Sequence, residues 1–581
     1  MRWLPDPLSE KTIELLENLV MPLIVGVVVG LAVVALYKLY EMVRLLSSML
    51  TSINPLLLVG STIIALLFGY LIIKFLAETK SWGCGTELMI EAYHYRSGFL
   101  SWKDTISKTL ASAVTIGFGG SAGLEGPSLL LGGGLTSAIT QKFGLKPDAI
   151  KKLYLCGAAA GFAAIFKAPL TGILLALEIP YRRDLETGVF VPAAIASVTS
   201  YLVSFAMLGG EVLFPILGLR LAIPSPIYIL HSTVLGVLSA LVALLFITSM
   251  DKLGKLSDFA AYRSPITCMA ILGGAALGII GLFFPQVIGL GYETIREAAT
   301  GQLCRLTFSA LVGLLLLKIF ATSLTIRLGG SGGLFIPSLY IGGILGIIYA
   351  KTFNLEPIPI YVMIAMAATI AAANKTLMTS VAFVAETIGS SSVILSVISA
   401  SISYFISGNR SLYSNQLVSK PVEEEEALAE LRHLIKTRKI RGLDKRKAEE
   451  FMTSKPIGLM EDIPLKEALT YIKAYGFRVY PVVNREQKLL GVIKVEDVLS
   501  IPPDKWDLPV SSVLIRRPLI ALRNHSILRV MEKMFEAGED HVYVVDSLKN
   551  RRLVGVIAAI DILRKMADIL REETRKPKGA S

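Results

Sequence analysis

The chain has few of the residues from which enzyme centres and metal sites are built. Its 581 residues include only four cysteines and five histidines. The cysteines do not have the spacing of a metal site or of a disulfide framework. The sequence also shows no paired carboxylates, no metal-ligand cluster and no combination of nucleophile and base. We therefore expect that the protein is not an enzyme, that it holds no metal and that it requires no cofactor.

Features of secreted and nucleic-acid-binding proteins are also lacking. The first turns of the chain carry several charges, and no short apolar core with a small-residue cleavage site follows them. We expect no removable signal peptide. The net charge of +12 alone would permit nucleic-acid binding, but no basic stripe interleaved with aromatic residues accompanies it. We expect no nucleic-acid partner.

Apolar residues are abundant, at 53% of the chain, and the mean hydropathy is +0.61. Several apolar runs reach the roughly 20 residues that cross a bilayer. They lie near residues 19–37, 55–76, 187–208, 227–249, 266–284 and 307–326. The runs at 335–350 and 390–407 are shorter or broken by glycine, and broken helices are tolerated at membrane depth only inside protein or beside a cavity. The sequence predicts a multi-pass protein of the cell membrane, surrounded by lipid.

The composition changes sharply near Pro421. Residues 421–581 contain 30 Lys and Arg and 25 Asp and Glu, which is more than half of all the charges in the chain. The change predicts a membrane domain over residues 1–420 and a soluble region after it. A charged helical linker over 421–448 is expected to join the two, and a basic tail is expected over 571–581.

A glycine-rich motif with a single carboxylate lies inside an apolar stretch, at Gly123-Leu124-Glu125-Gly126-Pro127. An ionisable residue at membrane depth is a candidate functional residue. The glycines let backbone N–H groups approach a small ligand, and the proline suits the first turn of a helix. Because a helix N-terminus attracts anions, the motif predicts an anion site. The carboxylate beside it would compete with the anion or carry a proton.

The membrane domain contains a weak internal repeat. The segment from Pro127 to Gly133 is similar to that from Pro337 to Gly343, and Glu178 matches Glu386 further on. Such repeats predict two related halves that meet at a central site, although the sequence does not show their relative orientation. A second glycine-rich loop before Pro337 would direct another helix N-terminus at the same anion, whereas a cation site would favour rings of carboxylates or carbonyls.

These residues resemble the CLC family of chloride channels and transporters over essentially the whole chain. That family has three anion-binding motifs and a tyrosine. The first motif, Gly-Ser-Gly-x-Pro, corresponds to residues 83–87, and the second, Gly-Lys/Arg-Glu-Gly-Pro, to residues 123–127. The third, Gly-x-Phe-x-Pro, corresponds to residues 333–337, and the tyrosine to Tyr413.

The resemblance implies an all-α polytopic membrane domain with two inverted repeats of broken helices. It also implies a homodimer with one anion pathway per subunit. The glutamate that matches Glu125 gates the pathway: it occupies the outer anion site when ionised and swings away when protonated. The central anion contacts the serine hydroxyl, the tyrosine hydroxyl and backbone amides of the third motif. Carried over, the anion-binding positions are Cys84, Gly123, Leu124, Gly126, Leu334, Phe335, Ile336 and Tyr413.

The chain departs from the family pattern in three places. Cys84 replaces the serine, and a thiol is a weaker donor than a hydroxyl. Glu87 stands where the first motif usually has proline. Ile179 occupies the position at which many exchangers of the family carry a proton-relay glutamate. This apolar residue slightly favours a passive chloride channel, gated by voltage or pH, over a proton-coupled chloride antiporter. A CBS-regulated divalent-cation channel is a remote alternative, which the glycine-rich motifs disfavour.

The soluble region contains a second repeat, over residues 449–503 and 509–570. Each copy has an apolar strand, a turn, another strand and a helix that opens near an aspartate, and the pattern resembles a tandem CBS pair. In nucleotide-binding CBS pairs, a hydroxyl residue and the aspartate hold the phosphate and ribose. Here Asp497 and Asp561 remain, but Lys494 and Ala558 replace the hydroxyl residues. Adenine-nucleotide binding and a purely structural dimerisation role both stay open, and we expect the pair to be cytoplasmic.

Overall fold

The chain forms two compact units in the computed structural model, Met1–Lys420 and Pro421–Ser581. Most of the predicted linker, Asp497 and the predicted basic tail lie outside the described residues. The structure describes residues 14–143, 145, 147–210, 214, 225–261, 265–420, 446–454, 456–475, 479–494, 498, 506–512, 517–537, 539–563 and 565–566.

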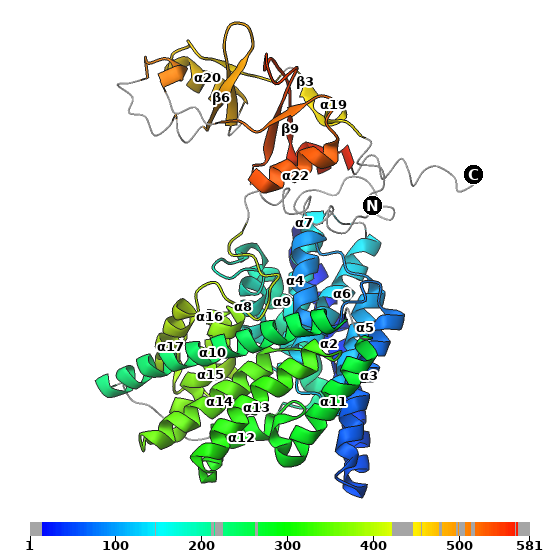
Figure 1. Cartoon of the computed structure of the whole chain (residues 1–581). Helices are drawn as coiled ribbons and strands as arrows, with labels where there is room; N and C mark the ends of the chain where they lie inside the picture. The colour runs from blue at the N-terminus through cyan, green and yellow to red at the C-terminus, as the bar shows by residue number, and fades with distance from the viewer. Residues whose placement is uncertain are drawn as a thin grey trace, which may run out of the picture. The chain divides into compact units, whose positions relative to one another are not determined.

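The first unit is built from helices of very unequal length (Figure 1). In its first half they are η1 (Leu16–Val20), α2 (Met21–Ile53), α3 (Leu57–Leu76), α4 (Gly85–Tyr95), α5 (Trp102–Gly117), α6 (Glu125–Phe143), α7 (Pro147–Phe166), α8 (Pro169–Glu178), η2 (Thr187–Val189) and α9 (Phe190–Leu208). In its second half they are α10 (Pro226–Ala261), α11 (Ile266–Phe283), η3 (Pro285–Val287), α12 (Tyr292–Ala299), η4 (Gln302–Arg305), α13 (Phe308–Arg327), α14 (Phe335–Thr352), α15 (Ile358–Asn374), α16 (Leu377–Thr387) and α17 (Val393–Ile406).

Eight helical segments among the described residues are long and apolar enough to cross a membrane. All six long runs predicted from the sequence are among them. The run that starts at Phe335 was expected to be short, but its helix reaches 18 residues. The segment Ala149–Phe166 was not predicted, because small residues and lysines lower its hydropathy; 89% of it is buried inside the protein. The helices α8, α15, α16 and α17 are shorter, as expected for broken helices.

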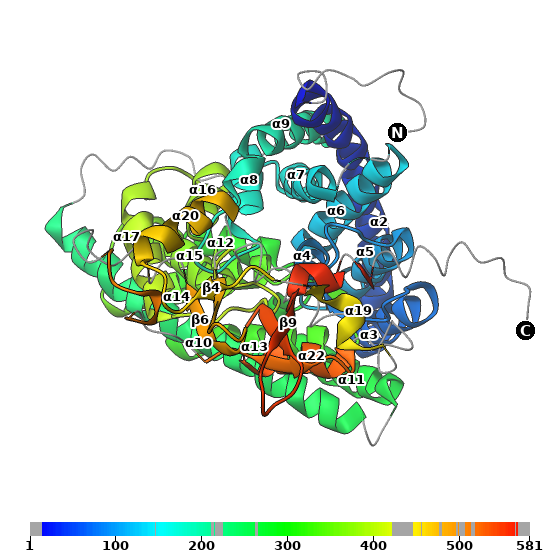
Figure 2. The same ribbon diagram turned by 90° about the horizontal axis from the view of Figure 1, so that it is seen from above.

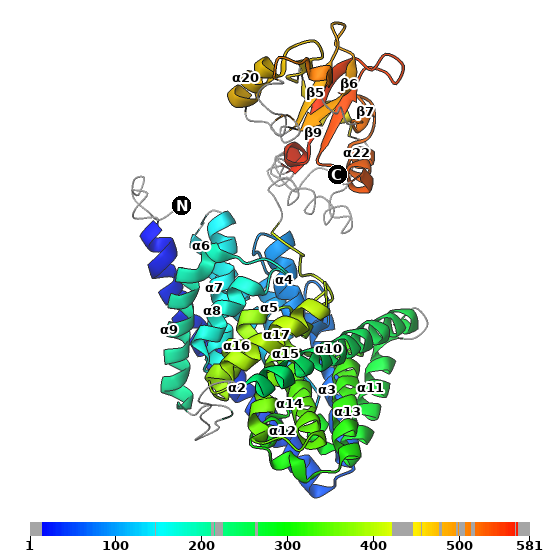
Figure 3. The ribbon, with the colours of Figure 1, turned by 90° about the vertical axis from the view of Figure 1, so that its left-hand side faces the viewer.

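The two halves of the first unit form adjoining groups of helices. Figure 2 shows α6, α7, α8 and α9 together on one side, and α14, α15, α16 and α17 together on the other. The helix α2 packs against α7 and α9, while α10 packs against α15 and α17. Figure 3 shows α10 running obliquely past these neighbours. The short helices α8 and α16 pack against each other where the two groups meet.

The glycine-rich segments of the two halves bond to each other at the centre of the unit. The short strand β1 (Gly83–Cys84) pairs in parallel with β2 (Ser331–Gly332). The Gly123 amide donates to the Gly333 carbonyl at 3.0 Å, and the Gly333 amide donates to the Gly123 carbonyl at 2.8 Å. These two glycines occupy equivalent positions in the repeat, so the reciprocal bonds show that the halves meet with their chains in opposite directions.

The described residues of the second unit form two small sheets. One has the order β4-β5-β6, with strands Leu459–Met460, Val479–Val483 and Leu489–Lys494. The other has the order β3-β9-β8-β7, with strands Thr453–Ser454, Leu553–Ala558, His541–Val545 and Ile520–Leu522. Its helices are α19 (Ala448–Phe451), α20 (Leu465–Tyr475), η6 (Val510–Ser512) and α22 (Ile527–Ala537).

The start of the first predicted CBS module joins the second sheet. The strand β3 pairs antiparallel with β9, and Ala448 and Phe451 are buried in the same core as Val530 and Met531. We assigned this segment to the first module from its order in the sequence, because no residue in it indicates that β3 pairs with a strand of the second module. The two modules are therefore interlocked, which joins them into a single unit.

Candidate anion site

Glu125 begins α6, and its carboxylate reaches the start of α14. The Oε1 atom accepts hydrogen bonds from the Phe335 amide at 2.6 Å and from the Ile336 amide at 3.4 Å. The residue is fully buried, and Oε2 has no hydrogen-bond partner among the described residues. Free amides at a helix N-terminus are the groups that attract anions. The carboxylate thus occupies a position where a bound anion would accept the same two hydrogen bonds.

The glycines of both motifs make room for this carboxylate. A Cβ atom added to Gly123 or Gly333 would overlap the carboxyl group of Glu125. Leu124 and Leu334, which follow the two glycines, are completely buried. The carboxylate consequently has apolar surroundings and a small number of backbone donors. The predicted glycine-rich elements of the two halves come together around Glu125.

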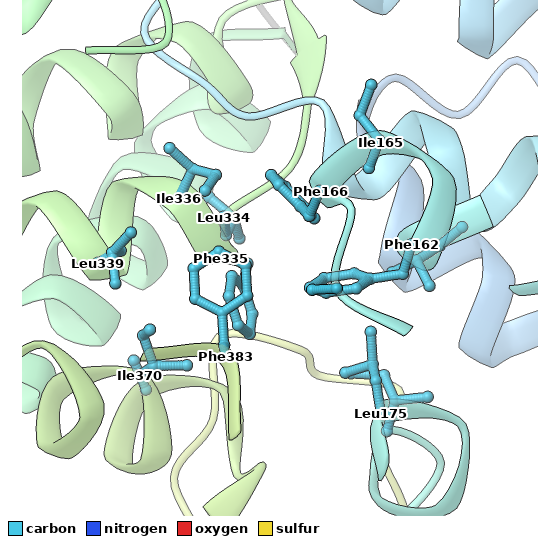
Figure 4. Close-up of a cluster of buried hydrophobic side chains, with 14 of the residues drawn as sticks. Phe162, Ile165, Phe166, Leu175, Leu334, Phe335, Ile336, Leu339, Ile370 and Phe383 are labelled. Carbon is cyan, nitrogen blue, oxygen red and sulfur yellow. The ribbon is translucent and has the colours of Figure 1, made fainter. Parts of the chain in front are cut away.

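Aromatic rings fix the backbone that binds the carboxylate. The Phe335 ring meets Phe383 edge to face with centroids 5.0 Å apart, and it meets Phe162 at 5.4 Å. Figure 4 shows these rings converging from α14, α16 and α7, with Phe166 beside them. Each such pair stabilises by roughly 0.5–1.5 kcal/mol beyond its buried area. The amide of Phe335 is therefore held in a fixed direction before any ligand arrives.

Cys84 and Tyr413 are the other side chains expected at the site, and both are buried. Cys84 precedes the first residue of α4 and is buried, and its carbonyl accepts a hydrogen bond from Lys108 Nζ at 3.3 Å. Tyr413 is 1% exposed and lies close enough to Cys84 and Glu125 to interact with both electrostatically. The structure thus brings together the predicted residues of three motifs and the tyrosine.

Ile179 follows the last residue of α8, and its buried apolar side chain cannot carry a proton. Its carbonyl accepts a hydrogen bond from Gln416 Nε2 at 3.0 Å, and the same nitrogen donates to the Asn374 carbonyl at 3.1 Å. The Ser411 hydroxyl donates to Gln416 Oε1 at 2.6 Å. Gln416 therefore fixes the turn that carries Tyr413, a role for which the sequence analysis had no signal.

Two buried lysines were also missed by the sequence analysis. Lys108 and Lys318 are 2% and 0% exposed, and they lie 210 positions apart, as Gly123 and Gly333 do. Lys318 Nζ donates to the Val287 carbonyl at 3.0 Å. A buried cation is costly, and one in a membrane domain is a candidate functional residue. The equivalent positions of these two lysines in the repeat were the signal that could have identified them.

An open cavity of about 740 Å³ is lined by residues from both halves of the first unit. Its walls include Tyr40, Arg44, Tyr292 and Arg296. Tyr292 is also close enough to Glu125 for electrostatic interaction. This cavity therefore comes near the buried carboxylate from the protein surface.

The second unit contains a separate cavity of about 480 Å³. Asp561, Ala558, Asp540 and His541 line it, together with apolar residues from both CBS modules. His541 Nδ1 lies 2.9 Å from Asp540 Oδ1. Burial raises the pKa of the Asp540 carboxyl, but the hydrogen bond and charge of His541 outweigh it and hold that pKa below its usual range. Among the described residues, no group of three or more His, Cys, Asp or Glu side chains could hold a metal ion.

Comparison with known proteins identifies a family for each of the two units. The family profile described as "Voltage gated chloride channel" matches residues 64–408, and the profile "CBS domain" matches residues 448–504 and 510–568. The "Voltage-gated ClC-type chloride channel ClcB" of Escherichia coli O17:K52:H18 (strain UMN026 / ExPEC) is 30% identical over 259 residues. The match spans 44% of this chain and 60%, less than two thirds, of that relative.

Two solved structures share the fold of the first unit. The crystal structure of "a CLC-type fluoride/proton antiporter" has a TM-score of 0.61 at 22% identity and covers 71% of this chain and 100% of its own. The structure of "a slow cyanobacterial Cl-/H+ antiporter" has a TM-score of 0.61 at 20% identity and covers 68% of this chain and 96% of its own.

Proposed function

The chain belongs to the voltage gated chloride channel family, CLC, and carries a tandem CBS pair after its membrane unit, and we propose that it moves chloride through a pathway gated by Glu125. The observation that carries the proposal is the pair of bonds from the Phe335 and Ile336 amides to the Glu125 carboxylate. An anion at the start of α14 would need the same donors. The carboxylate and chloride therefore compete for one position.

Protonation of Glu125 would change the outcome of this competition. A neutral carboxyl group attracts the amides and the helix N-terminus less than a carboxylate does, so chloride would displace it more readily. The buried Lys108, whose Nζ donates to the Cys84 carbonyl, would favour an anion beside the first motif. Tyr413 and Cys84 would supply the remaining contacts, and the thiol would donate more weakly than a hydroxyl.

Passive conduction, gated by voltage or pH, is the mode that we favour. Ile179 offers no proton acceptor at the end of α8, and its carbonyl is already bound by Gln416. Proton-coupled antiport is the alternative, and the two solved structures compared above are described as proton antiporters. In that mode, water would have to connect the far side of the membrane to Glu125 past the isoleucine.

Measurements of chloride and proton flux in liposomes distinguish passive conduction from antiport. Purified protein should dissipate a chloride gradient once a potassium ionophore supplies the compensating current. An outward chloride gradient is then imposed with equal pH on both sides. Robust chloride flux without proton movement is expected for the passive mode. Uphill proton movement that disappears in Glu125→Gln would establish antiport, and sodium or magnesium flux without chloride flux would overturn the proposal altogether.

We further propose that the protein is a homodimer with its CBS pair in the cytoplasm, as the family resemblance implies. The second unit supports a ligand-binding role, because Asp561 lies at a cavity of about 480 Å³. An adenine nucleotide is the ligand that the resemblance suggests, although Ala558 supplies no hydroxyl. The alternative is a structural role in dimerisation. Cross-linking in native membranes would test the dimer, and a protease added from the cytoplasmic side would test the location of the CBS pair.

A further inference from the structure

Glu87 occupies a position where the family motif has proline, and its contacts explain what the carboxylate does. It lies in the first turn of α4, three residues after Cys84. Its Oε1 atom accepts hydrogen bonds from the Ser414 amide at 3.2 Å and from the Ser414 hydroxyl at 2.8 Å. Its carbonyl accepts a third hydrogen bond, from Asn415 Nδ2, at 3.2 Å. The two residues that follow Tyr413 are thus fastened to the segment that begins at Cys84.

This contact lies between the buried site and the surface. Cys84 and Tyr413 are 2% and 1% exposed, whereas Glu87 is half-buried and Ser414 is exposed. A proline at position 87 would supply no side-chain acceptor. The carboxylate can accept two bonds at one oxygen, and hydrogen bonds to a charged group are stronger than neutral ones. The bonded pair therefore holds Tyr413 next to Cys84 from the solvent side.

We propose that Glu87 is a positioning residue that keeps the surface side of the anion site closed by fastening Tyr413 to the first motif. This inference rests on the proposed function, since it takes Cys84 and Tyr413 as parts of the chloride pathway. Without the Glu87 carboxylate, the bonds from Asn415 to the Glu87 carbonyl and from Arg182 Nη2 to the Ser414 carbonyl would remain, as would those that Gln416 and Leu412 make with α15. None of these four bonds engages the Ser414 amide or hydroxyl, so releasing the contact would let the turn beside Tyr413 move outward. The Cys84 thiol would become accessible to water, and chloride would be held less tightly.

The rate at which a reagent modifies the native Cys84 thiol measures whether the contact keeps the site closed. In full-length protein with every other cysteine changed to serine, a small charged methanethiosulfonate labels Cys84, and mass spectrometry follows the rate with and without chloride. Loss of hydrogen bonds to a charged group should raise the labelling rate on the order of tenfold in Glu87→Ala. Ser414→Ala should raise it less, because the Ser414 amide still donates. The double variant should equal Glu87→Ala, because both changes remove the same contact.

Two variants separate this role from general loosening of the helix. Glu87→Gln keeps an oxygen that accepts both bonds but loses the charge, and it should label at a rate between those of the parent and Glu87→Ala. Glu91→Ala, one turn further along α4, removes a side chain that pairs with Arg96 at 2.6 Å, and it should leave the Cys84 rate unchanged. Labelling in Glu87→Ala at the parent rate would overturn the proposal. So would equally fast labelling in Glu91→Ala or in Glu87→Gln.

Chloride distinguishes this inference from the proposed function. If Cys84 faces the anion site, bound chloride should slow its labelling. Because Glu87→Ala should hold chloride less tightly, a higher chloride concentration should be needed to slow the labelling in this variant than in the parent. Faster labelling in Glu87→Ala with no protection by chloride in any variant would support the contact and refute the anion site. Protection by chloride with equal rates in Glu87→Ala and the parent would support the anion site and refute the contact.

Discussion

Glu178 and Glu386 cap each other's helices. Glu178 ends α8, and its Oε2 atom accepts bonds from the Thr379 amide at 2.8 Å and the Thr379 hydroxyl at 2.6 Å near the start of α16. Glu386, near the end of α16, accepts the equivalent bonds from Thr171 at 2.8 and 2.5 Å near the start of α8. The two helices must therefore run antiparallel. Because they are equivalent in the repeat, the two halves are inverted relative to each other.

Removing one of these carboxylates should destabilise the membrane unit. In Glu178→Ala, the amides of Met378 and Thr379 lose their acceptor inside the protein, which costs roughly 1–3 kcal/mol. Glu178→Gln retains one oxygen and should have an intermediate effect. Thermal unfolding in detergent, followed by size-exclusion chromatography, measures the change. An unfolding temperature equal to that of the parent in Glu178→Ala would show that these bonds contribute little.

Glu125→Gln should remove most of the pH dependence of transport. In the parent, acid on the side from which Glu125 is reached should increase chloride flux, because the neutral carboxyl group competes less for the Phe335 amide. Glutamine is neutral at every pH and imitates the protonated state. Chloride efflux from liposomes, measured across a range of external pH, is the readout. If the variant retains the pH profile of the parent, another group must be the one that titrates.

Cys84→Ser should tighten chloride binding. A hydroxyl donates a better hydrogen bond than a thiol, and the gain is on the order of 1 kcal/mol, or about fivefold in affinity. Isothermal titration calorimetry with chloride measures it. Cys156→Ser is the matched control, because Cys156 is equally buried in α7 and donates to the Lys152 carbonyl. Equal affinity in Cys84→Ser and the parent would place Cys84 outside the anion site.

Lys108→Met should weaken chloride binding several-fold. The side chain of methionine fills similar space, but the variant lacks the positive charge that lies beside the Cys84 carbonyl. Because the surroundings are buried, water screens this charge poorly. Lys103→Met is the control on the same helix, since Lys103 is half exposed and paired with Glu78. Calorimetry should find unchanged affinity in Lys103→Met, and a similar result for Lys108→Met would contradict an electrostatic role.

Asp561→Ala should abolish any stabilisation of the protein by adenine nucleotides. The carboxylate lines the cavity of the CBS pair and is the group expected to hold the ribose. Thermal unfolding of the full chain with ATP, ADP or AMP measures the effect. Asp546→Ala is a suitable control, because Asp546 is exposed and does not line that cavity. No shift with any nucleotide in the parent would favour the purely structural role of the pair.

The sequence identified the parts of the site that have a local signature. Glycines, a proline and a lone carboxylate stand within five positions at residues 123–127, and the repeat pointed to their counterpart before Pro337. No such signature marks the bond between Glu87 and Ser414, which are 327 positions apart. Likewise, Gln416 is an ordinary polar residue until the fold places it between Ile179 and Asn374. Long-range partners of this kind follow from the packing of the helices.

The reciprocal capping by Glu178 and Glu386 also constrains the order in which the protein can be assembled. A ribosome adds Glu178 to the chain 201 residues before Thr379, the residue that will bind its carboxylate. Until Thr379 is added, the Glu178 carboxylate at the end of α8 has no donor from α16. Thr171, near the start of the same helix, likewise has no acceptor until Glu386 is added. A carboxylate in lipid without donors is unfavourable, so the first half must keep this end near water or protonated during synthesis. Neither half can form these capping bonds alone, and the bonds of both α8 and α16 form only once the second half has been added.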